Sequence, residues 1–521
     1  NVMYDFIEDM PENVIGVKIQ DDLSEDELDN LIRHISYSAT QRENLRLMIL
    51  FEDFNGWPDG TLLKITRFLM KNRKTLRRMA LIGQTENATL LESVPSSIPG
   101  MEIKRFDDQD SAHAWLLEDE THWTVDPSYY HGKVRQPKDM RILIVGAGVA
   151  GLTLASMLQQ RGMSPVVVED APEFGNIGYV IILMSAGSRV LKGLGVYDEL
   201  PKRGVLVDTY DIAKPDGEVL RAHSVADWYA PLFGNSFSIY RPTLVDIIRR
   251  SMQDDSVIRM GTTVDHIEQT NEVAHVTLSD GTEEDFDLVV GTDGLHSKVR
   301  KLIFTDVALD YSGLRGWAWW GEKNEEFENR ALEYWGTGGA FGLYPTDDRL
   351  CVVGVIKADP ESHDDPETRK DRIRQHFGDW GGWVPYGLEQ LDEMNAEEIF
   401  HDTFYYGNHE HWYHGRVVLA GDSVHPFSPI SGMGASMAME SAAVLAEELC
   451  YVDSKFIDQA LRKYEERRKF RVSTLQTQAR HFERVVTAEN TLLSSLRTFS
   501  LREIDDGPIH HFLARIPYEP V

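Results

Sequence analysis

The sequence is poor in cysteine and in basic residues, and it contains no long apolar run. Its two cysteines, Cys351 and Cys450, lie far apart and in no metal-ligand spacing, which argues against a disulfide framework or a zinc site. Lys and Arg number 53 against 84 Asp and Glu, and the formal net charge of -31 repels phosphate backbones and anionic lipids. We therefore expect no metal and no nucleic-acid partner.

Membrane and export signals are also missing. No stretch approaches the roughly 20 apolar residues of a membrane span. The acidic first residues lack the apolar core of a secretory signal. These features favour a cytoplasmic protein, and a reducing compartment agrees with the scarcity of cysteine. At roughly 150 residues per domain, the 521 residues predict two to four domains.

The first part of the chain has the pattern of a small α/β domain. Residues 14–118 alternate strand-like with helix-like segments. Ser24 and Glu27 form a capping box at the start of the first predicted helix, and Leu23 and Leu28 stand at the positions of a hydrophobic staple. No catalytic constellation is visible here. The order of elements resembles the SpoIIAA-like (STAS-related) family, which implies its fold and at most a small-ligand or partner-docking role.

A nucleotide-binding fingerprint follows at "MRILIVGAGVAGLTLASMLQQRGMSPVVVED". A buried strand leads into Gly146, Gly148 and Gly151, then into an amphipathic helix and a second strand that ends in Glu169. The first glycine permits a tight turn, the second lets the backbone approach a pyrophosphate, and the third allows close helix-sheet packing. Glu169 is placed to accept hydrogen bonds from a ribose. The sequence therefore predicts dinucleotide binding.

Two later segments distinguish FAD from NAD. The first, "DLVVGTDGLHSKVRKLI", contains Asp293, Gly294 and Arg300. The second, "GRVVLAGDSVHPFSPISGMGAS", contains Gly421, Asp422, Pro429, Gly432 and Gly434. Together with the fingerprint they resemble the class A flavoprotein aromatic hydroxylases, the para-hydroxybenzoate hydroxylase-like monooxygenases. The resemblance runs from about Met140 to about Arg471 and implies FAD as the cofactor.

The resemblance also implies roles for individual residues. Asp293 and Arg300 would anchor a segment shared by FAD and the incoming nicotinamide, and Arg241 would reach the flavin. Asp422 can accept from a ribityl hydroxyl, while a helix that begins near Gly432 and Gly434 aims its N–H groups at the flavin. The sequence departs from the family pattern at Asp170, where many relatives carry a basic residue.

The region between the two later motifs is rich in aromatics and in alternating strand patterns. This predicts an antiparallel sheet that covers the flavin and lines a cavity. The candidate substrate wall consists of Trp317, Trp319, Tyr334, Trp335, Phe341 and Tyr344. His425 is a candidate acid or base, although in this motif it more often shapes the turn over the cofactor. The catalytic residues are otherwise not identified by the sequence.

The expected architecture is α/β. It comprises a Rossmann-like FAD-binding domain with an inserted antiparallel-sheet substrate domain, preceded by the small α/β SpoIIAA-like domain. The predicted ranges are 1–119 for the SpoIIAA-like domain, 120–138 for a linker, 139–450 for the discontinuous FAD-binding domain, about 205–250 and 301–405 for the substrate domain, and 451–521 for a C-terminal helical region.

The resemblance implies an FAD-dependent monooxygenase (hydroxylase). NADH or NADPH would reduce FAD, oxygen would add to give C4a-hydroperoxyflavin, and its distal oxygen would pass to an aromatic or polyketide-like small molecule. Two alternatives stay open. One is a flavin reductase or dehydrogenase without oxygen transfer. The other is a flavin-based sensor whose N-terminal domain docks a protein partner.

Overall fold

The chain divides into two compact units in the structure, which is a computed structural model. One comprises Asn1–His122 with Lys469–Thr477, and the other Trp123–Arg468 with Gln478–Val521. The structure describes residues 4–7, 10, 14–41, 45–56, 61–72, 75–83, 102–117, 130–175, 178–224, 235–304, 309–359, 363–407, 409–490, 494–495, 497–498 and 501.

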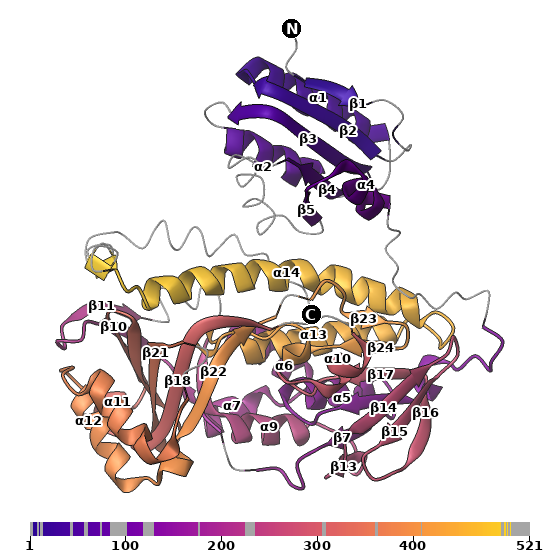
Figure 1. The fold of residues 1–521 in the computed structure, drawn as a ribbon. Coiled ribbons are helices and arrows are strands. Elements are labelled where there is room, and N and C mark those ends of the chain that lie inside the picture. The colour runs from indigo at the N-terminus through magenta and orange to yellow at the C-terminus, as the bar shows by residue number, and fades with distance from the viewer. Residues whose placement is uncertain are drawn as a thin grey trace. The chain divides into compact units, whose positions relative to one another are not determined.

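The smaller unit is built on a five-stranded sheet (Figure 1). Its strands, in spatial order, are β1 (Tyr4–Ile7), β2 (Val14–Asp22), β3 (Leu45–Gly56), β4 (Leu76–Ile82) and β5 (Glu102–Phe106). Only β1 runs antiparallel to its neighbour. Its helices within the described residues are α1 (Glu25–Gln41), α2 (Thr61–Asn72) and α4 (Gln109–Leu117).

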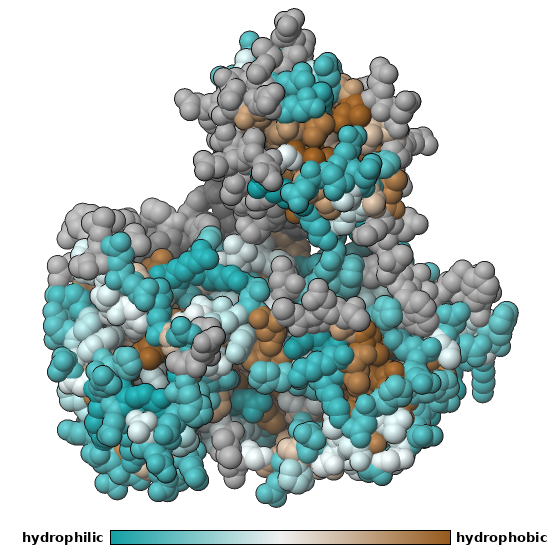
Figure 2. All heavy atoms as spheres, in the orientation of Figure 1, coloured by the Kyte–Doolittle hydropathy of each residue, from teal (hydrophilic) through white to brown (hydrophobic). Residues whose placement is uncertain are grey.

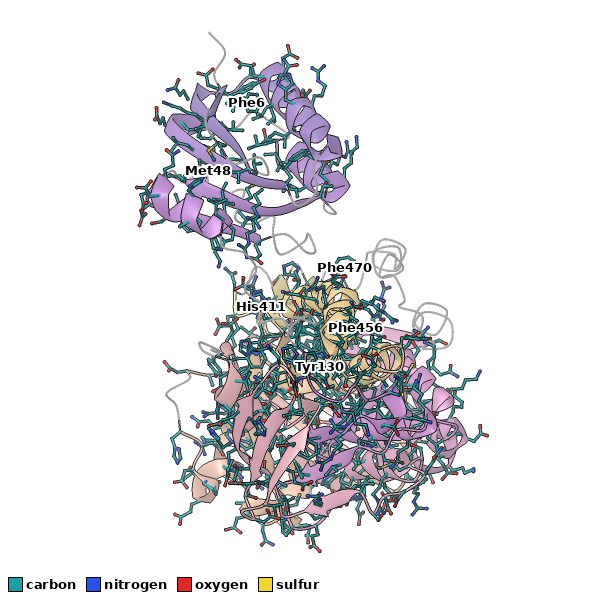
Figure 3. All side chains as sticks on the ribbon, turned by 90° about the vertical axis from the view of Figure 1, so that its right-hand side faces the viewer. Phe6, Met48, Tyr130, His411, Phe456 and Phe470 are labelled. Carbon is teal, nitrogen blue, oxygen red and sulfur yellow. The ribbon has the colours of Figure 1, made fainter. Side chains whose placement is uncertain are left out.

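Helices cover both faces of this sheet. Alternate residues of β3 belong to different clusters: Leu47 packs with the residues of α1 and α2, whereas Met48, labelled in Figure 3, packs with those of α4. The predicted capping box is confirmed, because Glu27 N donates to Ser24 Oγ at 3.3 Å and Ser24 N donates to Glu27 Oε2 at 3.0 Å.

The larger unit contains the predicted Rossmann-like sheet. Its strands are β13 (Ile258–Met260), β7 (Val166–Glu169), β6 (Ile142–Val145), β17 (Leu288–Gly291), β24 (Val417–Leu419) and β23 (Tyr413–His414). All neighbours are parallel except the last pair. Its helices include α5 (Val149–Gln160), α9 (Arg241–Arg249), α10 (Lys298–Ile303) and α13 (Gly434–Leu449).

A seven-stranded sheet forms the second layer of this unit. In spatial order its strands are β11 (Val219–Ser224), β10 (Thr209–Ala213), β19 (Arg330–Trp335), β20 (Gly339–Pro345), β21 (Arg349–Lys357), β18 (Asp310–Glu322) and β22 (Phe400–Tyr406). Its neighbours are antiparallel, as expected, apart from the parallel pair β10 and β19. Figure 1 shows α11 (Arg369–Phe377) and α12 (Val384–Glu389) beside it.

The remaining elements complete the larger unit. They are β8 (Val180–Leu183), β12 (Phe237–Tyr240) and β9 (Val205–Leu206) in one small sheet, β14 (Val264–Gln269), β15 (Ala274–Leu278) and β16 (Glu283–Phe286) in another, and the helices α6 (Ser185–Gly193), α7 (Leu200–Arg203) and α14 (Ile457–Val486) without its residues Lys469–Thr477. The predicted fold class is therefore confirmed, with α/β organisation in both units.

The polarity of the surface and of the helices agrees with the composition. Hydrophilic residues cover much of the face of the larger unit seen in Figure 2, as an acidic chain of net charge -31 requires. Within the described residues, every helix is too short or too polar to cross a membrane.

Candidate active site

A large cavity lies in the larger unit, between the Rossmann-like layer and the seven-stranded sheet. Its volume is about 1210 Å³. One wall is formed by the turn into α5, the segment before α13, and Arg241 at the start of α9. The other wall is one face of the seven-stranded sheet, and residues 478–488 of the C-terminal region also contribute. Motifs that are far apart in the sequence thus meet around one space.

The three fingerprint glycines differ in their surroundings. Gly146 has a φ of +104°, and a Cβ there would lie 2.6 Å from Thr292 O. A Cβ on Gly151 would lie 1.9 Å from Gly146 O, so only glycine allows α5 to pack this closely. Gly148 is different, because a Cβ there would meet no protein atom within 4 Å and the residue faces the cavity. The open space at Gly148 suits a ligand phosphate at the N-terminus of α5.

Glu169 ends β7 but does not line the cavity. Its Oε2 accepts a hydrogen bond from Ala147 N at 2.7 Å, and its Oε1 accepts from Ala171 N at 3.0 Å. The carboxylate is thus held beside the fingerprint turn, with lone pairs left for further donors. Ribose binding by Glu169 stays a prediction.

The segment from Gly421 to Gly434 supplies the other end of this wall. Gly421 and Gly432 have φ values of +69° and +62°, which glycine adopts readily. Asp422, Pro429, Gly432 and Gly434 line the cavity. Asp422 Oδ1 lies 4.0 Å from the position that a Cβ on Gly434 would take, so the carboxylate stands at the start of α13.

Asp422 is open to the cavity but lies deep beneath the protein surface. This burial raises the pKa of its carboxyl from 3.8 to about 6, and the positive charge of Arg241 opposes the increase. Arg241 itself lines the cavity. A carboxylate and a guanidinium are therefore both available to a polar ligand here.

Asp293 and Arg300 lie behind the cavity wall, whereas Gly294 between them lines it. Asp293 accepts hydrogen bonds from Ser297 Oγ at 2.5 Å and from Lys298 N at 2.7 Å, which caps α10. Arg300 donates to Ser423 O and to Leu295 O, each at 2.7 Å. These contacts hold the Gly294 turn and the Asp422 turn together, so in this structure both side chains position the site.

The six predicted wall aromatics divide between the two faces of the sheet. Trp335 and Tyr344 line the cavity with their side chains in clusters on that side. Trp317 and Phe341 also line it, but their side chains belong to the cluster on the opposite face, against α11 and α12. Strand alternation explains the division, because successive side chains point to opposite faces.

The other two aromatics do not line the cavity at all. Trp319 Nε1 donates to Gly387 O at 2.9 Å, and Tyr334 OH accepts from Trp383 N at 2.7 Å. Both are buried in the cluster shared with α11 and α12. The geometry therefore gives these two side chains a structural role.

His425 is likewise held away from the cavity. Its ring packs on Trp412 with centroids 5.0 Å apart, and its Nε2 lies 2.8 Å from Ser441 Oγ. Burial, reinforced by the positive charge of Arg468, lowers the pKa of His425 to about 3. A neutral, enclosed imidazole favours the alternative that His425 shapes the turn over the cofactor.

The strand register reveals cavity residues that the sequence did not suggest. Directly paired residues across all seven strands lie in one row, and every member of that row lines the cavity. The row consists of Arg221, Ile212, Glu333, Gly342, Val353, Ala318 and Phe400. In "ALEYWG", Glu333 alternates with buried Leu332 and Tyr334, a pattern that normally indicates a solvent-facing acid.

Cys351 on β21 is buried among residues on the cavity side of the seven-stranded sheet. It belongs to a cluster with Val180 and Ala318, against which Tyr344 and Val353 also pack. Burial raises the pKa of this thiol to about 12.

Comparison with known proteins agrees with this geometry. Residues 139–479 match the FAD binding domain family. The chain belongs to this family. Residues 14–117 match the SpoIIAA-like family.

Curated relatives of this FAD-binding chain are enzymes. It is 31% identical over 346 residues to 2-heptyl-3-hydroxy-4(1H)-quinolone synthase of Pseudomonas aeruginosa, covering 65% of this chain and 88% of that protein. It is 29% identical over 351 residues to 3-amino-4-hydroxybenzoate 2-monooxygenase of Streptomyces cremeus, covering 66% of this chain and 86% of that protein. Klebsiella pneumoniae HpxO, solved with FAD and uric acid, shares the fold at a TM-score of 0.66 and 23% identity, covering 75% of this chain and 98% of that one.

The larger unit is therefore that of an FAD-dependent monooxygenase, and FAD is its cofactor. The cavity fits this cofactor on structural grounds, since the Gly148 turn leaves free space in it and the start of α13 borders the same space.

Proposed function

We propose that this protein hydroxylates an aromatic or polyketide-like small molecule with NADPH or NADH and O2. The main support is that the fingerprint turn, Asp422, the start of α13 and an enclosed sheet face border one cavity. The names of two relatives point the same way, since each contains the name of an aromatic compound.

The protein's part in this reaction is to bind and orient. The N–H groups at the start of α5, beside Gly148, would hold the pyrophosphate. Glu169 would accept from the ribose and Asp422 from the ribityl chain. The N-terminus of α13, at Gly434, would place its dipole toward the flavin. Bound FAD would supply the redox chemistry, with the nicotinamide as hydride donor and O2 as the source of one oxygen atom for the substrate and one for water.

The sheet face would orient the substrate and exclude water. Aliphatic and aromatic side chains such as Ile212, Val353 and Phe400 line it, and they strengthen electrostatic contacts by displacing solvent. Asp293 and Arg300 would act as positioning residues through the turns that they hold.

We place the reaction in the cytoplasm, supported by two free cysteines, and assign partner docking to the SpoIIAA-like unit.

A leucine at Gly148 tests the cofactor assignment. Gly148 has φ -80° and ψ -167°, a backbone conformation open to any residue, and a side chain would meet no protein atom within 4 Å of its Cβ. Gly148→Leu should therefore fold and yet lose FAD, because the new side chain occupies the ligand's space. Flavin absorbance near 450 nm and the thermal unfolding midpoint measure the two properties.

Gly193→Leu is the matched control. Gly193 is exposed at the end of α6, and its nearest neighbour to a new Cβ is Met157 Cε at 3.8 Å. This variant should retain FAD. A yellow, FAD-saturated Gly148→Leu protein would contradict the assignment.

Anaerobic reduction tests the reaction type. Addition of NADPH or NADH should bleach the flavin, and an aromatic substrate should accelerate the bleaching. A flavin that neither nicotinamide reduces would instead favour a sensor.

A further inference from the structure

The cavity contains a carboxylate that the cofactor does not explain. Among the lining residues that the structure describes, Asp422 and Glu333 are the two acids, and Asp422 stands at the start of α13. Glu333 lies on the opposite wall, as the third member of the row of paired residues that crosses the seven-stranded sheet. A carboxylate in a mostly apolar wall is costly unless hydrogen-bond donors contact it.

Two neighbours hold the Glu333 carboxylate in place. Tyr344 OH donates to Oε1 at 2.5 Å, and Trp335 Nε1 donates to Oε2 at 2.7 Å. Burial and the charge of Glu333 keep the pKa of Tyr344 well above 10, so its hydroxyl remains a donor. Each carboxylate oxygen therefore keeps one lone pair for a further donor. We call Glu333, Trp335 and Tyr344 the Glu333 cluster.

Gly342 makes room for this arrangement. It pairs directly with Glu333, and a Cβ there would lie 2.5 Å from Tyr344 Cε2 and 2.8 Å from Tyr344 OH. The phenol ring therefore lies across the bare backbone of Gly342 and reaches Glu333. Any other residue at position 342 would displace the ring.

The Glu333 cluster and the predicted flavin site border one cavity. Gly432 lies beside Ile182, which packs in the same hydrophobic cluster as Val353 and Tyr344. The backbones of Val353 and Glu333 stand in one row two strands apart, which corresponds to about 10 Å. A molecule that extends along this row from Val353 to Glu333 needs roughly the length of a fused aromatic ring system.

We propose that the Glu333 cluster binds a ring N–H or O–H group at the far end of a fused aromatic substrate. This inference rests on the proposed function. A carboxylate only accepts hydrogen bonds, so a ligand that binds the free lone pairs of Glu333 must supply a donor. The two protein donors, Tyr344 OH and Trp335 Nε1, already bind the other lone pairs. A neutral donor suits the site better than a cation, because Arg221 shares the row and Arg497 donates to Trp335 O at 2.9 Å. Both arginines also line the cavity, so positive charge is already present in its lining.

Two further polar atoms of the cavity lining support a polar ligand in this cavity. Ser236 Oγ and Gln478 Oε1 are buried in the cavity lining, and neither has a hydrogen-bond partner among the described residues. Buried polar atoms are normally satisfied, so a ligand group is a fitting partner for each.

Matched probe pairs test the proposal on the FAD-loaded full chain. The probes are 4(1H)-quinolone, indole and 2-naphthol, each beside its N-methyl or O-methyl derivative. Binding is measured as the change in the flavin absorbance spectrum. For at least one pair, the donor-bearing member should bind about tenfold to hundredfold more tightly, the range expected for a hydrogen bond to a charged group.

Glu333→Gln should remove this preference and retain FAD. The glutamine keeps the shape, its Oε1 can accept from Trp335, and the Tyr344 hydroxyl can turn to accept from its Nε2. Glu328→Gln is the matched control, because Glu328 is exposed and does not line the cavity. It should behave as the unchanged protein does.

Each outcome decides the matter. Loss of the preference in Glu333→Gln alone supports the inference. An equal preference in Glu333→Gln and the unchanged protein overturns it, as does an FAD-loaded unchanged protein that binds no probe or shows no preference. An unchanged protein that takes up no FAD overturns the proposed function first, and that result is distinguishable because the flavin spectrum is absent.

Discussion

The two faces of the seven-stranded sheet differ although they share the same strands. The face toward α11 and α12 carries Trp319, Tyr334 and Phe341, closely packed and buried. The face toward the cavity mixes aromatic side chains with smaller or polar ones, among them Trp335, Tyr344, Glu333 and Gly342. The residues of the covered face thus stabilise the sheet from behind, and the other face remains free for ligands. Aromatic content alone does not locate a binding surface.

The largest expected effect comes from breaking the covered face. Phe341→Ala should lower the free energy of unfolding by about 3–5 kcal/mol, because it removes a fully buried ring that packs on Trp319 and Phe377. Denaturant titration measures this loss. Val353→Ala on the cavity face is the control and should cost only about 1 kcal/mol. Equal losses at the two positions would show that the faces do not differ as described.

A matched glycine pair sharpens the comparison. A Cβ on Gly354 would lie 2.8 Å from Phe377 Cε2 on the covered face, so Gly354→Ala should cost about 1–3 kcal/mol through overpacking. Gly342→Ala meets Tyr344, whose ring can move into the cavity, so its cost should be smaller. Its main effect should be a weaker preference for donor-bearing probes. A reversed order of stabilities in thermal unfolding would contradict this prediction.

The smallest effect concerns the opposite wall of the cavity, where water reaches Asp422 in flavin-free protein. Its pKa of about 6 lies above the ordinary 3.8, so the folded state holds the proton more tightly than the unfolded chain. This stabilising contribution is complete below about pH 4 and is lost as the pH rises through about 6. Flavin-free Asp422→Asn should therefore unfold at a higher temperature than the unchanged protein at pH 7.

The difference between Asp422→Asn and the unchanged protein should vanish near pH 4, where both side chains are neutral. Thermal unfolding between pH 4 and 7.5 tests this dependence. A difference that stayed constant over the whole range would assign it to packing.

The sequence predicted those features that depend on local backbone chemistry. Ser24 and Glu27 form their capping box, and Gly146 and Gly151 occupy positions where no other residue fits. Asp422 follows a strand end and lines the cavity, and its contact with the cofactor stays a prediction.

The features that depend on long-range pairing escaped prediction. Period-two alternation separates Tyr334 from Glu333, but only the packing of α11 and α12 decides which face is covered. Arg300 belongs to a recognisable motif, yet its contact with Ser423 O spans 123 residues of sequence. The register between strands that are distant in the sequence decides which way these side chains point.

The buried thiol of Cys351 has a consequence for durability. Only the thiolate reacts readily with peroxides, and a thiol with a pKa of about 12 remains protonated at neutral pH. A reduced flavin that reacts with oxygen in the absence of substrate releases hydrogen peroxide. The buried, protonated thiol of Cys351 would react only slowly with this peroxide. The enzyme should survive idle cycles of oxygen consumption without oxidative damage at this position.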